Sequence, residues 1–268
     1  TRQETIVLAM DVSGSMRATD VKPSRLAAAQ EAARAFIADQ PKSTRIGIVA
    51  FAGAAALVQP PTHSRDDLLA AIDRLQLQRG TAVGSGILVS LKTIVPDVEF
   101  DLRSANPRPS QRDGPRTLGA APPKDAPRAP PAPVEPGSVG NAVIVVLTDG
   151  QTTTGPDPVE AAKMAAERGV RVYTVGVGTP QGEIVGAEGW SMRVRLDEDA
   201  LKNIANLTRG EYFYAGSAED LRKVYDALTA RFTYEQKTIE VTALFAAAAA
   251  LVTILAAALS VLWFHRIV

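Results

Sequence analysis

IVLAMDVSGSM, residues 6–16, joins five apolar residues directly to a segment that carries one carboxylate and two hydroxyl groups. An unbroken apolar run of this length is typical of a strand buried on both faces of a parallel sheet. Asp11, Ser13 and Ser15 then alternate with other residues, and Gly14 stands between the two serines. These residue types suit a turn. The same alternation would also hold three oxygen donors together at the end of a buried strand.

Strands and helices alternate along the rest of the chain. Further strands are expected over residues 45–52, around 57–58, and over 142–150, 170–178 and 211–215. Helices are expected over residues 23–39, 64–75, 84–95, 158–168, 196–210 and 218–232. In the first helix, Pro23 is expected in the opening turn, where proline is tolerated. This alternation predicts an α/β fold with a doubly wound, mostly parallel sheet and helices on both faces.

Residues 96–140 interrupt the pattern, because they contain eleven of the eighteen prolines. Such a segment buries too little apolar surface to offset the entropy of ordering it, which favours a flexible insertion. A docking arm for a partner that recognises polyproline is the alternative interpretation.

Residues 241–264 carry no charge and include Trp263 and Phe264 at their end. A helix needs about 20 apolar residues to cross a hydrocarbon core, so the segment predicts a transmembrane helix; a buried alanine-rich helix is the alternative. We therefore expect a main domain over residues 1–235, a juxtamembrane linker over 236–240 and a short tail over 265–268. The chain begins at Thr1 without an initiator Met or a signal peptide, which suggests a fragment of a longer protein.

Composition excludes several classes of function. Lys and Arg together number 29, as do Asp and Glu, so the formal net charge is zero and gives no electrostatic reason to expect nucleic acid as a partner. There is no cysteine, and His63 and His265 are the two histidines. Thiolate chemistry, disulfides and sulfur- or histidine-based metal clusters are therefore excluded. Any metal must be bound by oxygen.

Three loops place oxygen donors where a parallel sheet binds its ligands, beyond the carboxyl ends of the strands. They are DVSGSM at residues 11–16, GTAVGSG at 80–86 and TDGQ at 148–151. Each loop alone is explained as a turn or a helix cap. Together, two carboxylates and three hydroxyls match the preferences of Mg²⁺, Mn²⁺ or Ca²⁺ rather than those of zinc or copper. The candidate metal ligands are Asp11, Ser13, Ser15, Thr81 and Asp149.

These five residues, in this order, resemble the metal-ion-dependent adhesion site (MIDAS) of von Willebrand factor type A (VWA) domains, and the resemblance covers residues 5–231. The segments RIGIVAFAG, GTAVGSGI and RVYTVGVGT further resemble the bacterial membrane-bound branch that includes BatA-like aerotolerance proteins. That resemblance implies a bacterial cytoplasmic (inner) membrane location with the domain on the extracytoplasmic side. It also implies a MoxR-type AAA+ ATPase and other VWA membrane proteins as partners.

Membrane orientation has a competing indication in the sequence. A positive-inside count would place the domain in the cytoplasm. The basic residues counted are Arg222, Lys223, Arg231 and Lys237 before the span and Arg266 after it.

The family resemblance implies that Ser13, Ser15 and Thr81 bind the ion directly, while Asp11 and Asp149 act largely through hydrogen bonds and water. An ion with few anionic ligands accepts a further carboxylate readily. The expected function is a membrane-anchored, metal-dependent protein interaction module that binds an Asp or Glu side chain of a partner protein.

A metal-dependent hydrolase or phosphatase with Asp11 as nucleophile is the main alternative. Such an enzyme needs a second carboxylate two residues later as general acid and base, and Ser13 occupies that position. The glycine-containing loops also lack the lysine of a phosphate-binding P-loop. We expect no catalytic residue and no enzymatic activity. A structural scaffold with an empty site would leave the five donors unexplained.

Overall fold

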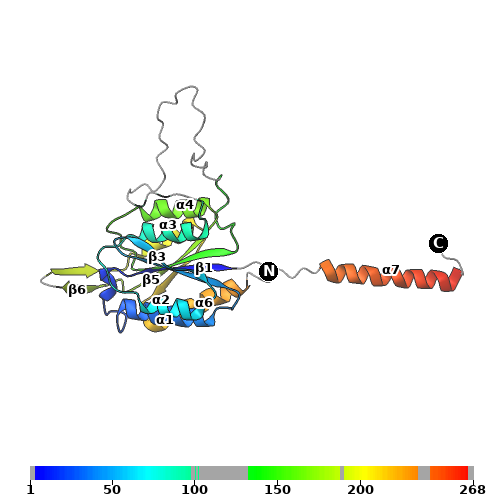
Figure 1. Ribbon diagram of the computed structural model, residues 1–268, viewed down its shortest axis with the longest axis horizontal. Helices are drawn as coiled ribbons and strands as arrows, with labels where there is room; N and C mark the ends of the chain where they lie inside the picture. Colours follow the sequence, from blue (N-terminus) through cyan, green and yellow to red (C-terminus); the bar gives the residue numbers. More distant parts are fainter. Residues whose placement is uncertain are drawn as a thin grey trace, which may run out of the picture. The chain divides into compact units, whose positions relative to one another are not determined.

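The computed structural model describes residues 4–97, 100, 102, 132–187, 190–234 and 242–264. The chain divides into two compact units, Thr1–Thr229 and Ala230–Val268. The first unit contains a six-stranded sheet in the order β3-β2-β1-β4-β5-β8 (Figure 1). Its strands are β1 (Thr5–Asp11), β2 (Arg45–Phe51), β3 (Ala55–Thr62), β4 (Ala142–Thr148), β5 (Arg171–Val177) and β8 (Tyr212–Ala215).

All neighbouring strands are parallel except β3, which runs antiparallel to β2. Strand β1 lies at the centre, where Ala9 pairs with Val49 of β2 and Val146 of β4. Residues 6–10 have no exposed surface, and every residue of β4 is buried. The predicted mostly parallel α/β sheet is therefore confirmed.

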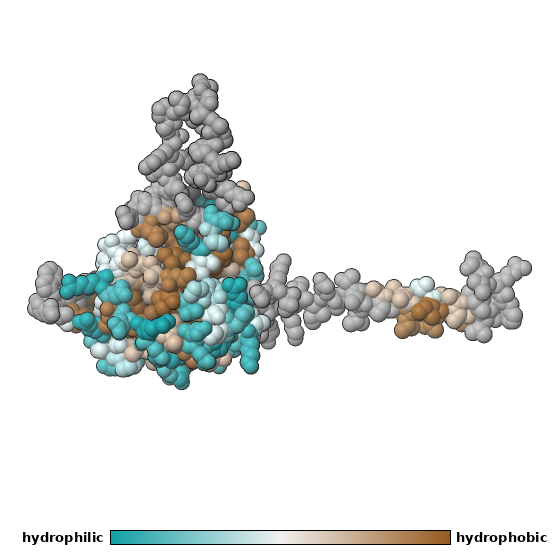
Figure 2. Space-filling model, in the orientation of Figure 1, coloured by the Kyte–Doolittle hydropathy of each residue, from teal (hydrophilic) through white to brown (hydrophobic). Residues whose placement is uncertain are grey.

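Helices cover both faces of the sheet, as the alternation predicts. On one face, apolar residues of α3, α4 and α5 form a single core with Val7 and Ala9 of β1. On the other face lie α1, α2 and α6 (Figure 1), where the rings of Phe36 and Tyr225 are 4.8 Å apart. The helices are α1 (Arg25–Asp39), α2 (Arg65–Asp73), α3 (Val83–Ile94), α4 (Pro158–Glu167), α5 (Glu198–Leu207) and α6 (Ala218–Tyr234). Hydrophilic residues dominate the outer surface over α1 and α2 (Figure 2), as expected for amphipathic helices.

Two local features differ from the sequence prediction. Pro23 precedes helix α1 instead of lying in its first turn, because Ser24 is the N-cap and its hydroxyl accepts the Ala27 N–H at 3.2 Å. A two-stranded hairpin of β6 (Glu183–Ala187) and β7 (Trp190–Val194) was not predicted. Figure 1 shows this hairpin beyond the edge of the main sheet.

The two outer strands of the sheet are irregular or short. Pairing of β3 with β2 shifts register between Ile46 and Val49, and β3 contains Pro60 and Pro61. Strand β8, at the opposite side, has four residues. The regular, buried part of the sheet therefore lies between β2 and β5.

Most of the proline-rich segment at residues 96–140 lies outside the described residues. Its described C-terminal part is attached near the start of β5, because the Val134 N–H donates to the Glu167 carbonyl at 2.9 Å and the Val139 N–H to the Gly169 carbonyl at 3.0 Å. The parallel strands begin at this edge of the sheet. The predicted metal ligands follow the other edge, where the strands end.

The second unit contains helix α7 (Thr242–Phe264). Crossing a membrane takes about 20 apolar residues in one helix. Within the described part of the chain, no helix has the length and apolarity that this requires. The prediction of a transmembrane helix over residues 241–264 is therefore corrected: the segment forms a helix, α7, but as far as it is described this helix does not meet the requirement for a membrane span. The predicted linker and tail lie outside the described residues.

Candidate metal centre

Three loops at the carboxyl edge of the sheet carry the predicted ligands. Asp11 ends β1 and Asp149 follows β4, and these two strands are neighbours. Ser13 and Ser15 belong to the cap and the first turn of the short helix η1 (Gly14–Arg17), while Thr81 precedes α3. All five side chains are buried, with exposures of 6% or less.

Asp11 organises the first loop through both of its carboxylate oxygens. Oδ1 accepts the Ser13 N–H at 2.7 Å, and Oδ2 accepts the hydroxyl of Thr148 at 2.6 Å. The hydroxyl oxygens of Ser13 and Ser15 lie 2.9 Å apart and share a hydrogen bond. The alternation seen in the sequence therefore directs both hydroxyls to one place.

Asp149 lies in the second loop, between a backbone donor and a buried arginine. Its Oδ1 accepts the Gln151 N–H at 3.2 Å, and its Oδ2 accepts Nη1 of Arg25 at 3.1 Å. The Asp149 carbonyl accepts the Asp197 N–H at 2.8 Å, which ties the loop to the start of α5. Neither Asp149 nor Arg25 is accessible to solvent.

Hydrogen bonds on both sides hold the loop that contains Thr81. The Thr81 N–H donates to Oγ1 of Thr153 at 2.9 Å, and the Thr81 carbonyl accepts the Thr153 N–H at 2.8 Å. On the other side the Gln78 N–H donates to the Val12 carbonyl at 2.7 Å. The loop of Thr81 thus joins the loops of Asp11 and Asp149. Over the described residues, the Thr81 hydroxyl makes no hydrogen bond to the other four donors.

Burial and proximity disfavour negative charge on the two carboxylates. Burial raises the pKa of Asp11 to about 7, the charge of Asp149 adds to this, and hydrogen bonds from Ser13 and Thr148 oppose it. Burial also raises the pKa of Asp149, against the opposing effects of the Ser15 hydrogen bond and of Arg25. Such a pair gains stability from a nearby cation, since an opposite charge favours the ionised form.

Arg25 is a buried residue of this edge that the sequence did not reveal. Its Nε donates to Oδ1 of Asp20 at 2.8 Å and its Nη2 to Oδ2 of Asp20 at 2.6 Å, while Nη1 reaches Asp149. A bidentate arginine pair of this kind is strong and geometrically specific. Little in the sequence indicates this pair. Asp20 and Arg25 are five residues apart with Pro23 between them, and this spacing does not match the period of a helix or a strand.

Asp20 and Glu183 attach the β6–β7 hairpin to the same edge. Oδ2 of Asp20 accepts both the N–H and the hydroxyl of Thr179 at 3.0 Å. Glu183 accepts the Asp20 N–H at 2.8 Å, the Thr19 hydroxyl at 2.9 Å and the Thr19 N–H. Burial opposes ionisation of Asp20, but Arg25 and Thr179 outweigh it and lower the pKa of Asp20 to about 2. A continuous set of contacts therefore runs from Asp149 to the hairpin.

The donor set fits a hard divalent cation. Two carboxylates and three hydroxyls offer oxygen alone, which suits an ion that keeps some of its water. In the part of the chain that the structure describes, no group of three or more His, Asp or Glu side chains is placed to hold a metal. The candidate centre is consequently one of low negative charge.

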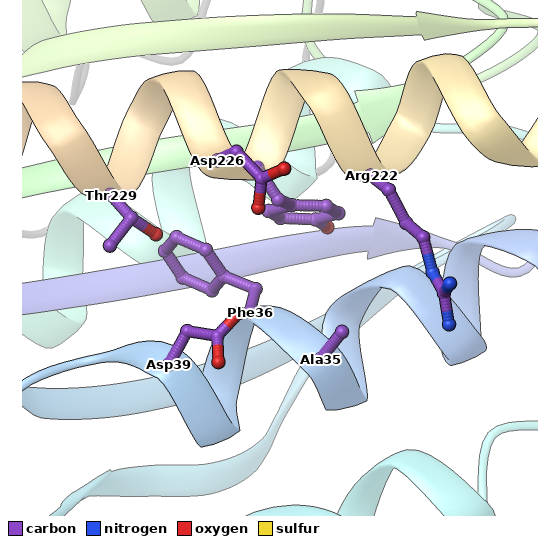
Figure 3. A pocket seen from close by; sticks show the side chains of 7 residues that line it. Ala35, Phe36, Asp39, Arg222, Asp226 and Thr229 are labelled. Carbon is purple, nitrogen blue, oxygen red and sulfur yellow. The ribbon is translucent and has the colours of Figure 1, made fainter.

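A cavity of about 210 Å³ lies between α1 and α6 and is lined by none of the predicted ligands (Figure 3). The Tyr225 hydroxyl is buried there without a hydrogen-bond partner. Its lining residues are Ala35, Phe36, Asp39, Arg222, Tyr225, Asp226 and Thr229. The lining residues of α1 come from its second half, whereas Arg25, which contacts Asp149, is at its start. The cavity is therefore separate from the candidate centre.

Comparison with known proteins gives a consistent family. Two sequence profiles of the von Willebrand factor type A domain match residues 6–108 and 137–227. A protein of Nocardia farcinica named UPF0353 protein is 35% identical in an alignment of 245 residues that covers 86% of this chain and 64% of that protein. The chain thus spans less than two thirds of that relative.

Two solved structures have the same fold. The hypothetical protein BatB from Bacteroides thetaiotaomicron is 24% identical with a TM-score of 0.63, over 88% of this chain and 100% of that one. An aerotolerance-related membrane protein from Bacteroides fragilis is 23% identical with a TM-score of 0.61, over 86% and 99%. At this identity the likeness concerns the fold alone. Sequence profiles and fold agree, and the chain therefore contains a von Willebrand factor type A domain.

Proposed function

We propose that this domain is a divalent-metal-dependent protein interaction module, with Mg²⁺, or Mn²⁺ or Ca²⁺, held at the candidate centre. VWA domains are typically modules of this kind. The observation that carries the proposal is the burial of Asp11 and Asp149 at one edge, with the neutral hydroxyls of Ser13 and Ser15 beside them. The residues that would hold the ion are Asp11, Ser13, Ser15, Thr81 and Asp149.

The chemistry of the donors suggests what the module binds. Mg²⁺ takes six oxygen ligands at about 2.0 to 2.1 Å and usually keeps several waters. Hydroxyl ligands leave most of its charge uncompensated, so the bound ion would supply an electrophilic position for one more carboxylate. Both oxygens of Asp11 and of Asp149 already accept hydrogen bonds from the protein. The missing acid is accordingly proposed to come from an Asp or Glu of a partner protein.

Catalysis by Asp11 is disfavoured by the same contacts. A nucleophilic carboxylate must present a free oxygen to its substrate, whereas Oδ1 and Oδ2 of Asp11 are engaged by Ser13 and Thr148. The position for a second acid is Ser13, whose hydroxyl bonds to Ser15. We therefore propose a binding function without enzymatic activity.

Metal titration tests the proposal. Calorimetric addition of Mg²⁺ and Mn²⁺ to the 268-residue chain should show binding, and the ion should raise the melting temperature, because a ligand that binds the folded state stabilises it. Ser13→Ala should abolish both effects. Ser90→Ala is the matched control, since Ser90 is equally buried but donates to the Gly86 carbonyl within α3. Equal metal binding by the two variants would contradict the proposal.

The setting of this function is proposed from the family resemblance. A membrane complex at the bacterial cytoplasmic membrane, with a MoxR-type AAA+ ATPase and other VWA membrane proteins as partners, fits the aerotolerance-related membrane protein of Bacteroides fragilis among the structural relatives. Cell fractionation would test the location. Co-purification with wild type and Asp11→Ala would test the partners, and identical partners for both would count against a metal-mediated contact.

A further inference from the structure

Four exposed arginines lie next to the loops of the candidate metal centre in the sequence or on the hairpin that contacts them. Arg17 ends η1, two residues after Ser15, and Arg79 comes two residues before Thr81. The other two lie at the end of β7 and directly after it. We call these four residues the arginine collar: Arg17, Arg79, Arg193 and Arg195, all exposed.

Backbone contacts fix the collar to the metal edge. The Arg79 carbonyl accepts the Gly53 N–H at 2.9 Å, in the loop after β2. The Arg195 carbonyl accepts Nε2 of Gln151 at 2.9 Å, and Gln151 is two residues after Asp149. Between the collar residues of the hairpin, Val194 is buried and its carbonyl lies 3.5 Å from Nη2 of Arg25. Arg17 and Arg79 therefore adjoin two of the three loops of the centre in the sequence, and Arg195 contacts the third loop through Gln151.

The collar arginines differ from three other surface arginines, which have an acidic partner. Arg34 lies 2.6 Å from Asp73, Arg209 lies 2.7 Å from Glu135, and Arg222 lies 3.8 Å from Glu31. Across the described ranges, none of the four collar arginines has a carboxylate within 4.0 Å. Within the described structure these four guanidinium groups are therefore available to carboxylates of another molecule.

We infer that the partner segment is acidic over several residues, with one carboxylate for the metal and others for the arginine collar. This inference rests on the proposed function. A guanidinium pairs with a carboxylate through two parallel hydrogen bonds. A ring of such groups also attracts an acidic segment from a distance and orients its approach. The four arginines would then supply specificity for clustered Asp or Glu, which the metal alone does not provide.

The surroundings indicate where the acidic segment would lie. A hollow of about 530 Å³ beside Arg195 is also lined by the acidic first turn of α5. Glu198 and Asp199 in that turn would repel further carboxylates. We therefore expect the segment to lie over η1 and the hairpin rather than over the first turn of α5. A nucleic acid is the less favoured occupant, because the chain has no overall basic excess.

Two labelled peptides test this inference by fluorescence anisotropy with the 268-residue chain. One is hexaglutamate, and the other has a single Glu among five Gln. In millimolar Mg²⁺, hexaglutamate should bind at least about tenfold more tightly, since each exposed charge pair contributes about two- to fivefold. The triple variant R17Q/R79Q/R195Q should lose this advantage and keep the affinity for the single-Glu peptide. The matched control R34Q/R209Q/R222Q removes equal charge elsewhere and should bind like wild type.

The outcomes separate the collar from the metal. Equal affinity for the two peptides, both lost with EDTA, would overturn the collar and leave the proposed function intact. Tight hexaglutamate binding that survives EDTA and Asp11→Ala but not the collar variant would support the collar and contradict the metal-mediated contact. Equal weakening by both triple variants would overturn the collar. So would equally tight binding of a single-stranded hexanucleotide, which would indicate a general anion surface, or no binding of either peptide.

Discussion

At the scale of single residues, Arg25 balances the charges at the edge of the sheet. Its guanidinium contacts Asp20 and Asp149, and the arginine has no exposure to solvent. Buried charges are tolerated when they are paired, and removing one partner leaves the others uncompensated. Asp11, the other buried carboxylate of the centre, accepts its hydrogen bonds from Ser13 and Thr148 instead. A divalent cation at the centre would favour the ionised form of both Asp11 and Asp149.

Replacing Arg25 tests this balance. Arg25→Met should lower the free energy of unfolding by about 3 to 5 kcal/mol, because Asp20 and Asp149 would lose their buried partner. Urea denaturation in EDTA measures the effect. Arg34→Met is the control, since that side chain is 36% exposed and its surface ion pair contributes about 1 kcal/mol or less. Similar losses for the two variants would contradict a special role of Arg25.

The lowered pKa of Asp20 predicts a dependence of stability on pH. Because its pKa is about 2 in the folded protein instead of 3.8, ionised Asp20 stabilises the fold at neutral pH, and this contribution is lost as pH falls from about 4 to about 2. We expect it to amount to about 1 to 2 kcal/mol after allowance for solvent screening. Asp20→Asn should flatten the unfolding free energy over that interval. An unchanged slope in this variant would refute the assignment.

At the scale of elements, the sequence predicted what local pattern determines. The buried strands β1 and β4 follow from unbroken apolar runs, and α4 begins where Asp157 caps it, with the Val159 N–H at 2.7 Å from Oδ1. The β6–β7 hairpin was missed because its contacts with the rest of the domain include those of Glu183 with Thr19 and Asp20, which are distant in sequence. The five candidate ligands lie in loops at strand ends or before a helix and could be proposed from local sequence, whereas the role of Arg25 depends on its contact with Asp149, 124 residues away.

Glu183 provides a test at this scale. Hydrogen bonds from Thr19 are the main cause that lowers the pKa of Glu183, so these contacts favour the ionised carboxylate. Glu183→Gln should weaken these bonds and speed amide hydrogen exchange across the β6–β7 hairpin, with the central sheet unaffected. Glu160→Gln, which removes a surface pair with Lys163, is the control. Unchanged exchange in the hairpin would show that other contacts hold it.

At the scale of the whole domain, the candidate metal centre and the attachment of the proline-rich segment lie at opposite edges of the sheet. The metal centre follows the ends of the parallel strands, whereas the described part of the proline-rich segment attaches where the strands begin, through Val134 and Val139. The length of that segment was evident from composition, but its point of attachment depends on backbone hydrogen bonds to Glu167 and Gly169. Composition carries no information about such contacts.

Shortening the proline-rich segment tests this separation. Replacing residues 104–130 by a short Gly-Ser linker should leave the Mg²⁺-induced rise in melting temperature unchanged, because the attachment lies at the opposite edge of the sheet. The shortened protein retains Val134 and Val139 and their backbone partners. Loss of the metal effect, with the fold intact by circular dichroism, would show that the segment contributes to the centre.

The irregular outer strands of the sheet bear on how the molecule avoids self-association. Unpaired strand edges are templates for addition of further chains and hence for aggregation. Here β3 carries Pro60 and Pro61, which offer no N–H, and β8 is four residues long. Neither edge is a good template for a growing sheet. Crowded neighbours could therefore meet through loops and side chains without the sheets fusing into fibrils.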